Sequence, residues 1–314
     1  MPVQQADVIP LPRRAQETPS RPPRQLAPVT ELRPRRAPES LSGKIAGFVR
    51  KRLTGDYPVD DFGFDPELTD AVVLPPMRMI YEKWFRVEVT GAANLPVDSG
   101  ALIVANHSGT LPWDAAMTAI AVHDNHPNGK HLRMLGADLL FKVPVLGTFA
   151  RRTGQTLACG ADAQRLLRSG EIVGVWPEGF KGIGKPFSER YRLQRFGRGG
   201  FVATAMKAGV PIIPCSIVGA EEIYPKLADL TPLAKLLGLP YFPVTPFFPL
   251  LGPLGAIPLP TKWHIDFGAP VRTDLAGQDA ADDHGEVLEV AEEVRSTIQD
   301  TLNSMVAERE SVFR

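Results

Sequence analysis

Short apolar runs alternate along this chain with segments of helical character, and this alternation constrains its fold more than any other feature. Runs typical of strands occupy residues 101–105, 172–176, 212–218 and 263–267. Helical spacing or a closing glycine marks residues 112–122, 161–169, 200–208 and 287–305. Alternating strands and helices predict an α/β domain with a mixed, mostly parallel sheet flanked by helices.

The start of the chain has a different character. Residues 1–40 are rich in proline and arginine and lack apolar periodicity, so they are predicted to be a disordered tail. Residues 41–314 are predicted to be one domain that begins with amphipathic helices. The first helix, 41–53, has basic residues between its apolar positions, so it either lies on an anionic membrane or docks on the domain.

Charge and cysteine content exclude several classes of protein. The 35 basic and 35 acidic residues cancel, which disfavours a nucleic-acid-binding module. Cys159 and Cys215 form no CxxC pair, so neither a disulfide framework nor a cysteine zinc site is expected. With no signal-peptide pattern at the N-terminus, the sequence favours a cytoplasmic protein.

A long uncharged stretch lies between Lys235 and Lys262. It is long enough to cross a bilayer, but seven prolines interrupt it, so a spanning helix is not expected. Its aromatic residues, among them Phe247 and Phe248, suit a membrane interface. The alternative is a loop that covers the sheet or lines a pocket.

The strongest candidate for chemistry is the segment that begins Asn106-His107-Ser108. It follows a predicted strand, and ligands of α/β sheets bind at the carboxyl ends of strands. Asp114 can accept a hydrogen bond from one ring nitrogen of His107 and leave the other free as a general base. From spacing alone, a histidine that merely caps the next helix remains the alternative.

Two further segments carry polar residues. Pro177-Glu178-Gly179 follows the second strand, where Glu178 would bind a hydroxyl or position His107, unless the segment is a plain turn. The glycine-rich segment 181–198 would bind phosphate or anionic headgroups, unless it is a solvated face. Its basic residues are Lys181, Lys185, Arg190, Arg192, Arg195 and Arg198.

Two other interpretations, a metal site and a serine hydrolase, are disfavoured. His123, His126 and His131 have a spacing that suggests a metal site, but they lie in a turn-rich segment without Cys or Glu, so no metal is predicted. Ser108 lacks the G-x-S-x-G elbow of a serine hydrolase, and a neighbouring histidine is badly placed to serve as its base.

Taken in order, residues 85–220 resemble the glycerolipid acyltransferase family. The matching segments are Asn106-His107 with Asp114, Gly147 with Arg151 or Arg152, Pro177-Glu178-Gly179, and residues 210–214. The chain departs from the family pattern in having six residues between His107 and Asp114, a longer spacing than usual. In the second of these segments, or second block, the family arginine is ambiguous because Arg151 and Arg152 both fit.

The resemblance implies transfer of a fatty acyl group from acyl-CoA or acyl carrier protein to a lipid hydroxyl, with 1-acyl-glycerol-3-phosphate the favoured acceptor. His107 would be the base and Asp114 its orienting partner, while the second-block arginine and Glu178 would contact the acceptor. No cofactor is expected beyond the acyl donor.

Two alternatives remain open. Residues 191–224 are similar to the diacylglycerol acyltransferase branch, which implies a neutral glyceride acceptor. A non-catalytic lipid-binding protein on the same scaffold is the other alternative. For the enzyme, the expected partners are the acyl donor, the lipid acceptor and the inner face of the membrane, to which it would attach peripherally.

Overall fold

The computed structural model describes residues 41–108, 111–238 and 241–314, so the predicted tail 1–40 lies outside the described residues. The chain divides into two units, Met1–Tyr57 and Pro58–Arg314. In the first unit, residues predicted to be helical form α1 (Leu41–Thr54), with Val49 and Leu53 exposed. The guanidinium of Arg52 lies over the rings of Phe48 and Tyr57.

The second unit is built on a seven-stranded sheet with the order β1-β9-β6-β2-β5-β3-β4. Every pairing is parallel except β6 with β9, which confirms the predicted mixed, mostly parallel sheet. The strands are β1 (Glu88–Thr90), β2 (Ala101–Ala105), β3 (Leu132–Gly136), β4 (Gln155–Leu157), β5 (Ile172–Val175), β6 (Ile212–Val218) and β9 (His264–Phe267).

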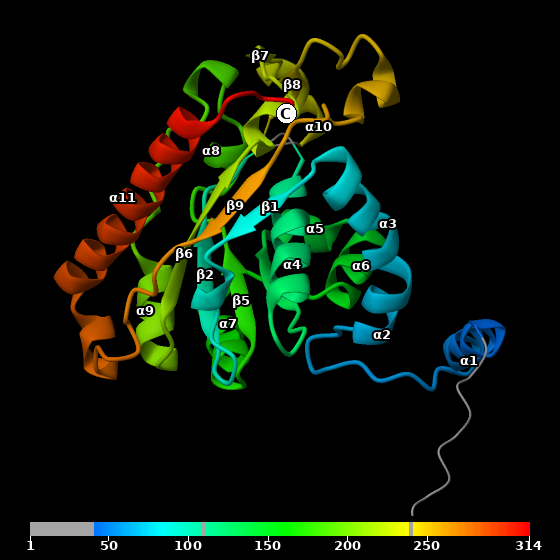
Figure 1. Ribbon diagram of the computed structural model, residues 1–314, viewed down its shortest axis with the longest axis horizontal. Coiled ribbons are helices and arrows are strands. Elements are labelled where there is room, and N and C mark those ends of the chain that lie inside the picture. The colour runs from blue at the N-terminus through cyan, green and yellow to red at the C-terminus, as the bar shows by residue number, and fades with distance from the viewer. Residues whose placement is uncertain (1–40, 109–110, 239–240) are drawn as a thin grey trace, which may run out of the picture. The chain divides into compact units, whose positions relative to one another are not determined.

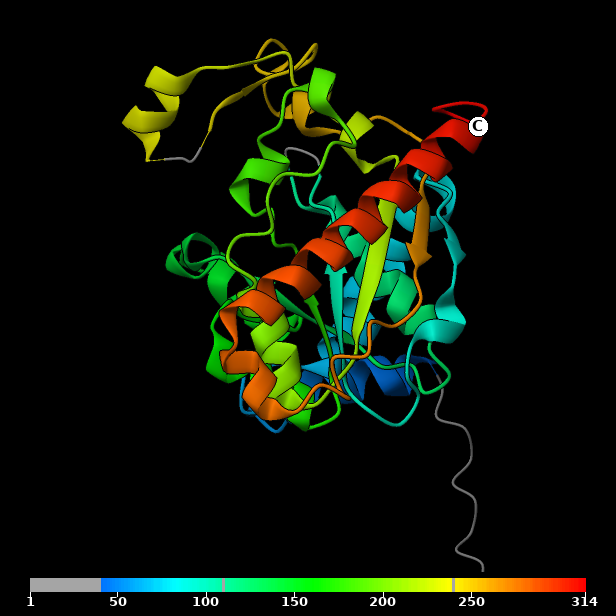
Figure 2. The same ribbon diagram turned by 90° about the vertical axis from the view of Figure 1, so that its left-hand side faces the viewer.

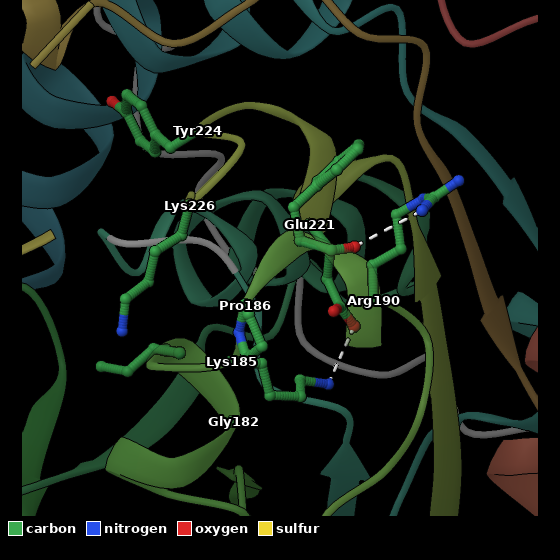
Figure 3. A pocket seen from close by; sticks show the side chains of 9 residues that line it. Gly182, Lys185, Pro186, Arg190, Glu221, Tyr224 and Lys226 are labelled. Carbon is green, nitrogen blue, oxygen red and sulfur yellow. Dashed lines mark hydrogen bonds and ion pairs between the residues drawn. The ribbon is translucent and has the colours of Figure 1, made fainter. Parts of the chain in front are cut away.

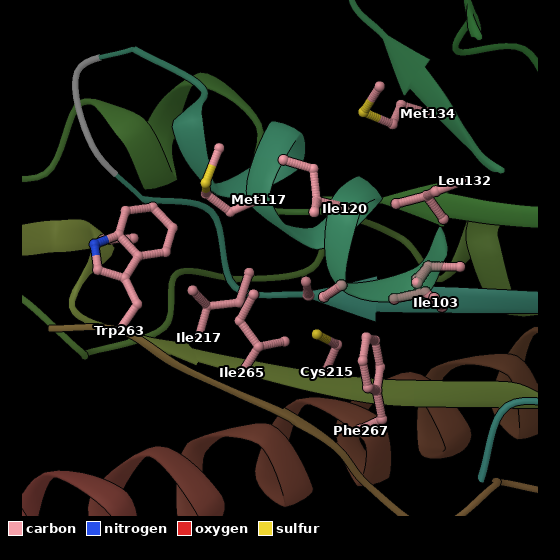
Figure 4. Packing of buried hydrophobic residues seen from close by; sticks show 14 of the residues in the cluster. Ile103, Met117, Ile120, Leu132, Met134, Cys215, Ile217, Trp263, Ile265 and Phe267 are labelled. Atoms are coloured by element: carbon pink, nitrogen blue, oxygen red, sulfur yellow. The ribbon is translucent and has the colours of Figure 1, made fainter. Parts of the chain in front are cut away.

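Helices cover both faces of the sheet (Figures 1 and 2). Alternate residues of β2 point to opposite sides, so Ile103 belongs to one hydrophobic cluster and Leu102 to the other. One face packs against α3 (Leu74–Met79) and α4 (Trp113–Asn125), and Figure 4 shows Met117 and Ile120 of α4 over this face. The other face packs against α7 (Gly160–Arg168), α9 (Gly200–Ala208) and α11 (His284–Glu308).

A helical segment before β1 contains two π-helical turns. α2 (Pro66–Leu68) continues into a π turn at Thr69–Val73, and α3 continues into another at Ile80–Trp84. Pro75 and Pro76 have no backbone N–H, so a regular α-helical hydrogen-bond ladder cannot continue through them. Tyr81 and Phe85 of this segment lie in the core.

Three short helices lie in the connections at the strand ends. α5 (Asp138–Lys142) and α6 (Leu146–Arg152) connect β3 to β4, and α8 (Phe180–Ile183) follows β5.

Between β6 and β9 the chain makes an excursion, residues 227–257. It contains β7 (Ala228–Asp229), α10 (Thr231–Leu237), β8 (Pro243–Val244) and a 3-10 turn at Gly252–Ala256. Within the described ranges, no helix combines the length and apolar character needed to cross a membrane. The excursion exposes many apolar side chains: Leu227, Leu230, Leu236, Leu237, Phe247, Leu250, Leu251, Leu254 and Ile257.

Candidate active site

Three neighbouring parallel strands end at the same edge of the sheet. β2 pairs with β5 on one side and with β6 on the other, so the residues that follow them lie close together. His107 follows β2, Glu178 follows β5, and Glu221 follows β6. This carboxyl edge is where α/β sheets bind their ligands.

Asn106 fixes the position of the segment that leaves β2. Its side-chain amide donates to the carbonyl of Ile217 at 3.0 Å, and its side-chain oxygen accepts from the N–H of Ile217 at 2.8 Å. Asn106 is fully buried, so both bonds are shielded from water. It therefore continues the β2–β6 pairing by one residue and sets the direction in which His107 leaves the sheet.

Asp114 reaches His107 despite the long spacing between them. The distance from His107 Nδ1 to Asp114 Oδ2 is 2.6 Å, and the backbone N–H of Ser108 donates to the same oxygen at 2.9 Å. Asp114 lies in the first turn of α4, where the helix dipole favours a negative charge, and its second oxygen accepts from the N–H of Ala115. With a carboxylate accepting at Nδ1, the lone pair of the ring lies on Nε2.

Glu178 holds the backbone of His107. Its Oε1 accepts from the His107 N–H at 2.9 Å, and its Oε2 accepts from the Gln194 N–H at 2.7 Å. The ammonium of Lys185 lies 3.5 Å from Oε2, and the Glu178 side chain has no exposed surface. Both carboxylate oxygens are occupied within the protein, so in this structure Glu178 positions His107.

Gly182 lets α8 approach the histidine closely. A Cβ atom at this position would lie 2.7 Å from the Cβ of Glu178 and 2.9 Å from the Cβ of His107. Neither atom is the free end of a flexible side chain, so a larger residue would push the helix away. Sequence reasoning did not single out Gly182, because a close approach is visible only once β2 and β5 are paired.

A pocket lies beside this site, between the segments that follow β5 and β6 (Figure 3). Its lining includes Gly182, and Lys185 donates to Glu221 at 3.1 Å across it. Lys226 forms an ion pair with Asp229 at 2.9 Å, while Arg190 lies over the ring of Phe187.

Burial raises the pKa of Glu221 to about 7, and the ion pair with Lys185 acts in the opposite direction. Glu221 was not among the predicted site residues, although it follows a predicted strand as His107 and Glu178 do. That shared position was the signal that could have identified it.

The predicted arginines of the second block lie at the other edge of the sheet. α6 ends at Arg152, and β4 begins at Gln155, so Arg151 and Arg152 precede β4 while His107 follows the parallel strand β2. The Arg152 guanidinium lies 3.7 Å from the buried Asp65, and Arg151 lies over the ring of Phe141.

Arg195 and Arg198 are exposed and lie in the segment before α9. The hydrogen bond from Arg295 is the main cause of the lowered pKa of Glu292, and the positive charge of Arg195 adds to it, so Arg195 lies near α11. Gly199, next to Arg198, packs against Val287 in the first turn of α11. The structure thus brings together His107, Asp114 and the Pro177-Glu178-Gly179 turn, and it places Arg151 and Arg152 away from them.

Comparisons with known proteins agree on one family. A family model described as Acyltransferase matches residues 86–218, which include His107, Asp114 and Glu178. An uncharacterized protein of Mycobacterium tuberculosis is 56% identical over 87% of this chain and 76% of its own length.

More distant similarity extends to named enzymes. A human protein named "DGAT1/2-independent enzyme synthesizing storage lipids" is 24% identical over 72% of this chain and 67% of its own. A chloroplast 1-acyl-sn-glycerol-3-phosphate acyltransferase of Arabidopsis thaliana is 26% identical over 45% of this chain and 38% of its own. The crystal structure of the LPA acyltransferase PlsC from Thermotoga maritima aligns with a TM-score of 0.49 at 19% identity, over 85% of this chain and 91% of that one.

Proposed function

The chain belongs to the glycerolipid acyltransferase family, and on that premise we propose that it transfers a fatty acyl group from an acyl thioester to a glycerolipid hydroxyl with His107 as general base. The observation that carries this proposal is the 2.6 Å contact between His107 Nδ1 and Asp114 Oδ2. It leaves Nε2 as the basic nitrogen of a ring whose side chain is 14% exposed.

In the proposed reaction, Nε2 takes the proton of the acceptor hydroxyl while the hydroxyl oxygen attacks the thioester carbonyl. A carbon–oxygen bond forms, and the carbon–sulfur bond then breaks. The departing thiolate takes the proton back from the His107 imidazolium, so the enzyme returns to its starting state. Asp114 stabilises the imidazolium and fixes its ring orientation, and Glu178 holds the His107 backbone.

The favoured acceptor is 1-acyl-glycerol-3-phosphate, and the favoured donor is acyl-CoA or acyl carrier protein. Support comes from the Pro177-Glu178-Gly179 turn beside His107 and from the plant relative, which is named for that acceptor. Contacts of the acceptor with Arg151, Arg152, Arg195 and Arg198 remain predictions. The position of Arg151 and Arg152 at the opposite edge does not favour their contacts.

A neutral glyceride is the second candidate acceptor, and the charges around the pocket favour it. Lys185 lies 3.5 Å from Oε2 of Glu178, Lys226 pairs with Asp229, and Arg190 lies 4.0 Å from Glu222. Cations neutralised in this way attract a phosphate weakly. The human relative, named for storage-lipid synthesis, is also similar over more of this chain than the plant enzyme.

We also propose that the enzyme attaches peripherally to the inner face of a membrane. The excursion supports this proposal, because it departs and returns at the edge of the sheet that holds His107 and exposes leucines there. Both ribbon views place it at that end of the sheet (Figures 1 and 2). α1 offers a separate apolar and basic surface through Leu53 and Lys51.

Radiolabelled acyl-CoA and radiolabelled acyl carrier protein, each supplied with a panel of acceptors, test the function. The panel contains 1-acyl-glycerol-3-phosphate, its dephosphorylated monoglyceride and a diacylglycerol, with lipid products separated and identified. Preferred labelling of the phosphorylated acceptor supports the first candidate, and preferred labelling of a neutral glyceride supports the second. Release of free fatty acid without any acylated lipid, with either donor, would overturn the proposal.

A further inference from the structure

Three polar side chains from separate segments of the second unit converge at the helical segment before β1. Asp70 lies in the π turn after α2, His123 in the last turn of α4, and His131 directly before β3. Each offers one ligand atom, and the three atoms lie within 4.8 Å of one another. We propose that Asp70, His123 and His131 form a binding site for Zn²⁺ or a similar divalent transition-metal ion.

The distances are close to those of a metal site. His131 Nε2 lies 3.3 Å from Asp70 Oδ1, and His123 Nε2 lies 3.7 Å from the same oxygen. Ligand atoms about 2.0 Å from a tetrahedral zinc ion are about 3.3 Å apart. Two of the three separations are therefore within a few tenths of an ångström of the required value, a shift that side-chain rotation can provide.

The surroundings of His123 restrain its ring. Its Nδ1 lies 2.9 Å from Asp124 Oδ1 and 3.2 Å from Nη2 of Arg78, which also pairs with Asp124. In the tautomer that donates from Nδ1 to Asp124, Nε2 presents its lone pair, which is the usual arrangement behind a metal-bound imidazole. Nε2 of His123 is the atom that faces Asp70.

The charges around the three ligands act in both directions. The cations Arg78 and Arg133 weaken attraction for a metal ion, while the carboxylates of Asp70 and Asp124 strengthen it.

The donor set determines the class of metal. Two imidazole nitrogens and one carboxylate suit zinc, cobalt, nickel or iron, whereas magnesium and calcium require oxygen ligands. The Asp70 side chain is 52% exposed, so water has access to the remaining coordination positions. This assignment revises the absence of metal expected from sequence, where Asp70 was not considered.

The position of the metal site, far from His107, indicates a structural role for the ion. α4 carries Asp114 in its first turn and His123 in its last, and the 13 residues of this helix span about 20 Å. A metal ion would link the segment before β1 to α4 and β3, at the opposite end from His107. His126 takes no part, because its Nε2 lies 3.0 Å from the Pro96 carbonyl oxygen and its Nδ1 accepts from the Asn128 N–H.

Titration of the untagged full chain with Co²⁺, followed by competition with Zn²⁺, tests the proposal. The parent should bind one Co²⁺ with the visible absorption of a tetrahedral or five-coordinate ion, and Zn²⁺ should displace it and raise the melting temperature. Asp70→Asn and the double variant His123→Ala/His131→Ala should bind at least about tenfold more weakly, without the melting shift.

The exposed His284, in the first turn of α11, provides the matched control. His284→Ala should bind Co²⁺ and Zn²⁺ as the parent does. Because Asp70→Asn changes only an exposed carboxylate, it keeps the test valid if the double histidine variant fails to fold. Binding by Asp70→Asn as tight as by the parent, or a parent whose cobalt spectrum stays that of the hydrated ion, would overturn the proposal.

Discussion

At the scale of single residues, Asp114 is predicted to act on the rate of the chemical step. Asp114→Asn keeps the size of the side chain but removes the charge that stabilises the His107 imidazolium. We expect kcat to fall about 10- to 10³-fold with little change in KM, as measured by steady-state kinetics. Asp279→Asn, at an exposed position, is the control and should retain full activity. Equal kcat values for the two variants would remove Asp114 from the mechanism.

Glu221 should make stability depend on pH. Its pKa is about 7 in the folded protein, because burial outweighs the pairing with Lys185 and nearby Glu178 also raises it. An unfolded glutamate has a pKa of about 4.3, so between about pH 4.5 and 7 the folded state holds a proton that the unfolded chain releases. The bound proton therefore stabilises the folded state at low pH. This stabilisation is lost as pH rises through 7, and above that pH the stability no longer changes with the ionisation of Glu221.

Urea unfolding at pH 5, 6, 7 and 8 measures this effect. Glu221→Gln cannot lose a proton at this position. Its free energy of unfolding should therefore increase relative to that of the parent as pH rises from 5 to 8. Parallel pH profiles for the two proteins would show that Glu221 is ionised in the folded state throughout this range.

At the scale of elements, the approach of α8 to β2 is predicted to be sensitive to one methyl group. Gly182→Ala places a Cβ within 3 Å of both Glu178 and His107, so α8 or His107 must shift. Since small displacements of catalytic groups slow the chemical step strongly, kcat should fall on the order of tenfold or more. Gly200→Ala, in the first turn of α9 with free space around it, should leave kcat unchanged. If both alanine variants match the parent, the close packing is irrelevant to catalysis.

The excursion is predicted to provide the membrane contact. Leu250 and Leu254 are 84% and 66% exposed, and each contributes roughly 1–2 kcal/mol when it enters an apolar phase. The double variant Leu250→Ser/Leu254→Ser should therefore sediment much less with anionic vesicles, at an unchanged melting temperature. Phe248 is a poor site for this test because it packs against Phe242.

The control for the excursion replaces two exposed leucines elsewhere, Leu275→Ser/Leu288→Ser. A separate deletion of residues 41–53 measures what α1 adds. If the excursion variant sediments as well as the parent, or the parent does not bind vesicles, the proposed attachment is wrong.

The sequence predicted those elements whose signal is local. β2 and β6 were predicted with the bounds that the structure has, because each is a continuous apolar run. β1, β3 and β4 were not predicted. β1 and β4 have three residues each and lack an apolar run, and β3 carries Arg133. The buried guanidinium of Arg133 finds partners in Asp60 and the ring of Phe64, far away in the sequence.

At the scale of the whole molecule, the site combines residues that only the sheet order brings together. His107 and Glu178 were predicted because each follows a recognisable strand, and the order β6-β2-β5 explains why they meet. Arg151 and Arg152 directly precede β4. Their edge of the sheet could not be predicted because β4 itself was not predicted. Asp70 joins His123 and His131 only after the helices before β1 have packed.

The most direct test of the account is the rate of lipid acylation by His107→Ala. Wild type and variant are compared with labelled acyl-CoA and the preferred acceptor, after melting curves show that both are folded. General base catalysis predicts a fall in kcat of about 10²–10⁴-fold with KM little changed, because His107 has no other role in substrate binding in this account. A folded His107→Ala variant that loses less than tenfold in kcat would contradict the assignment of His107 as the catalytic base.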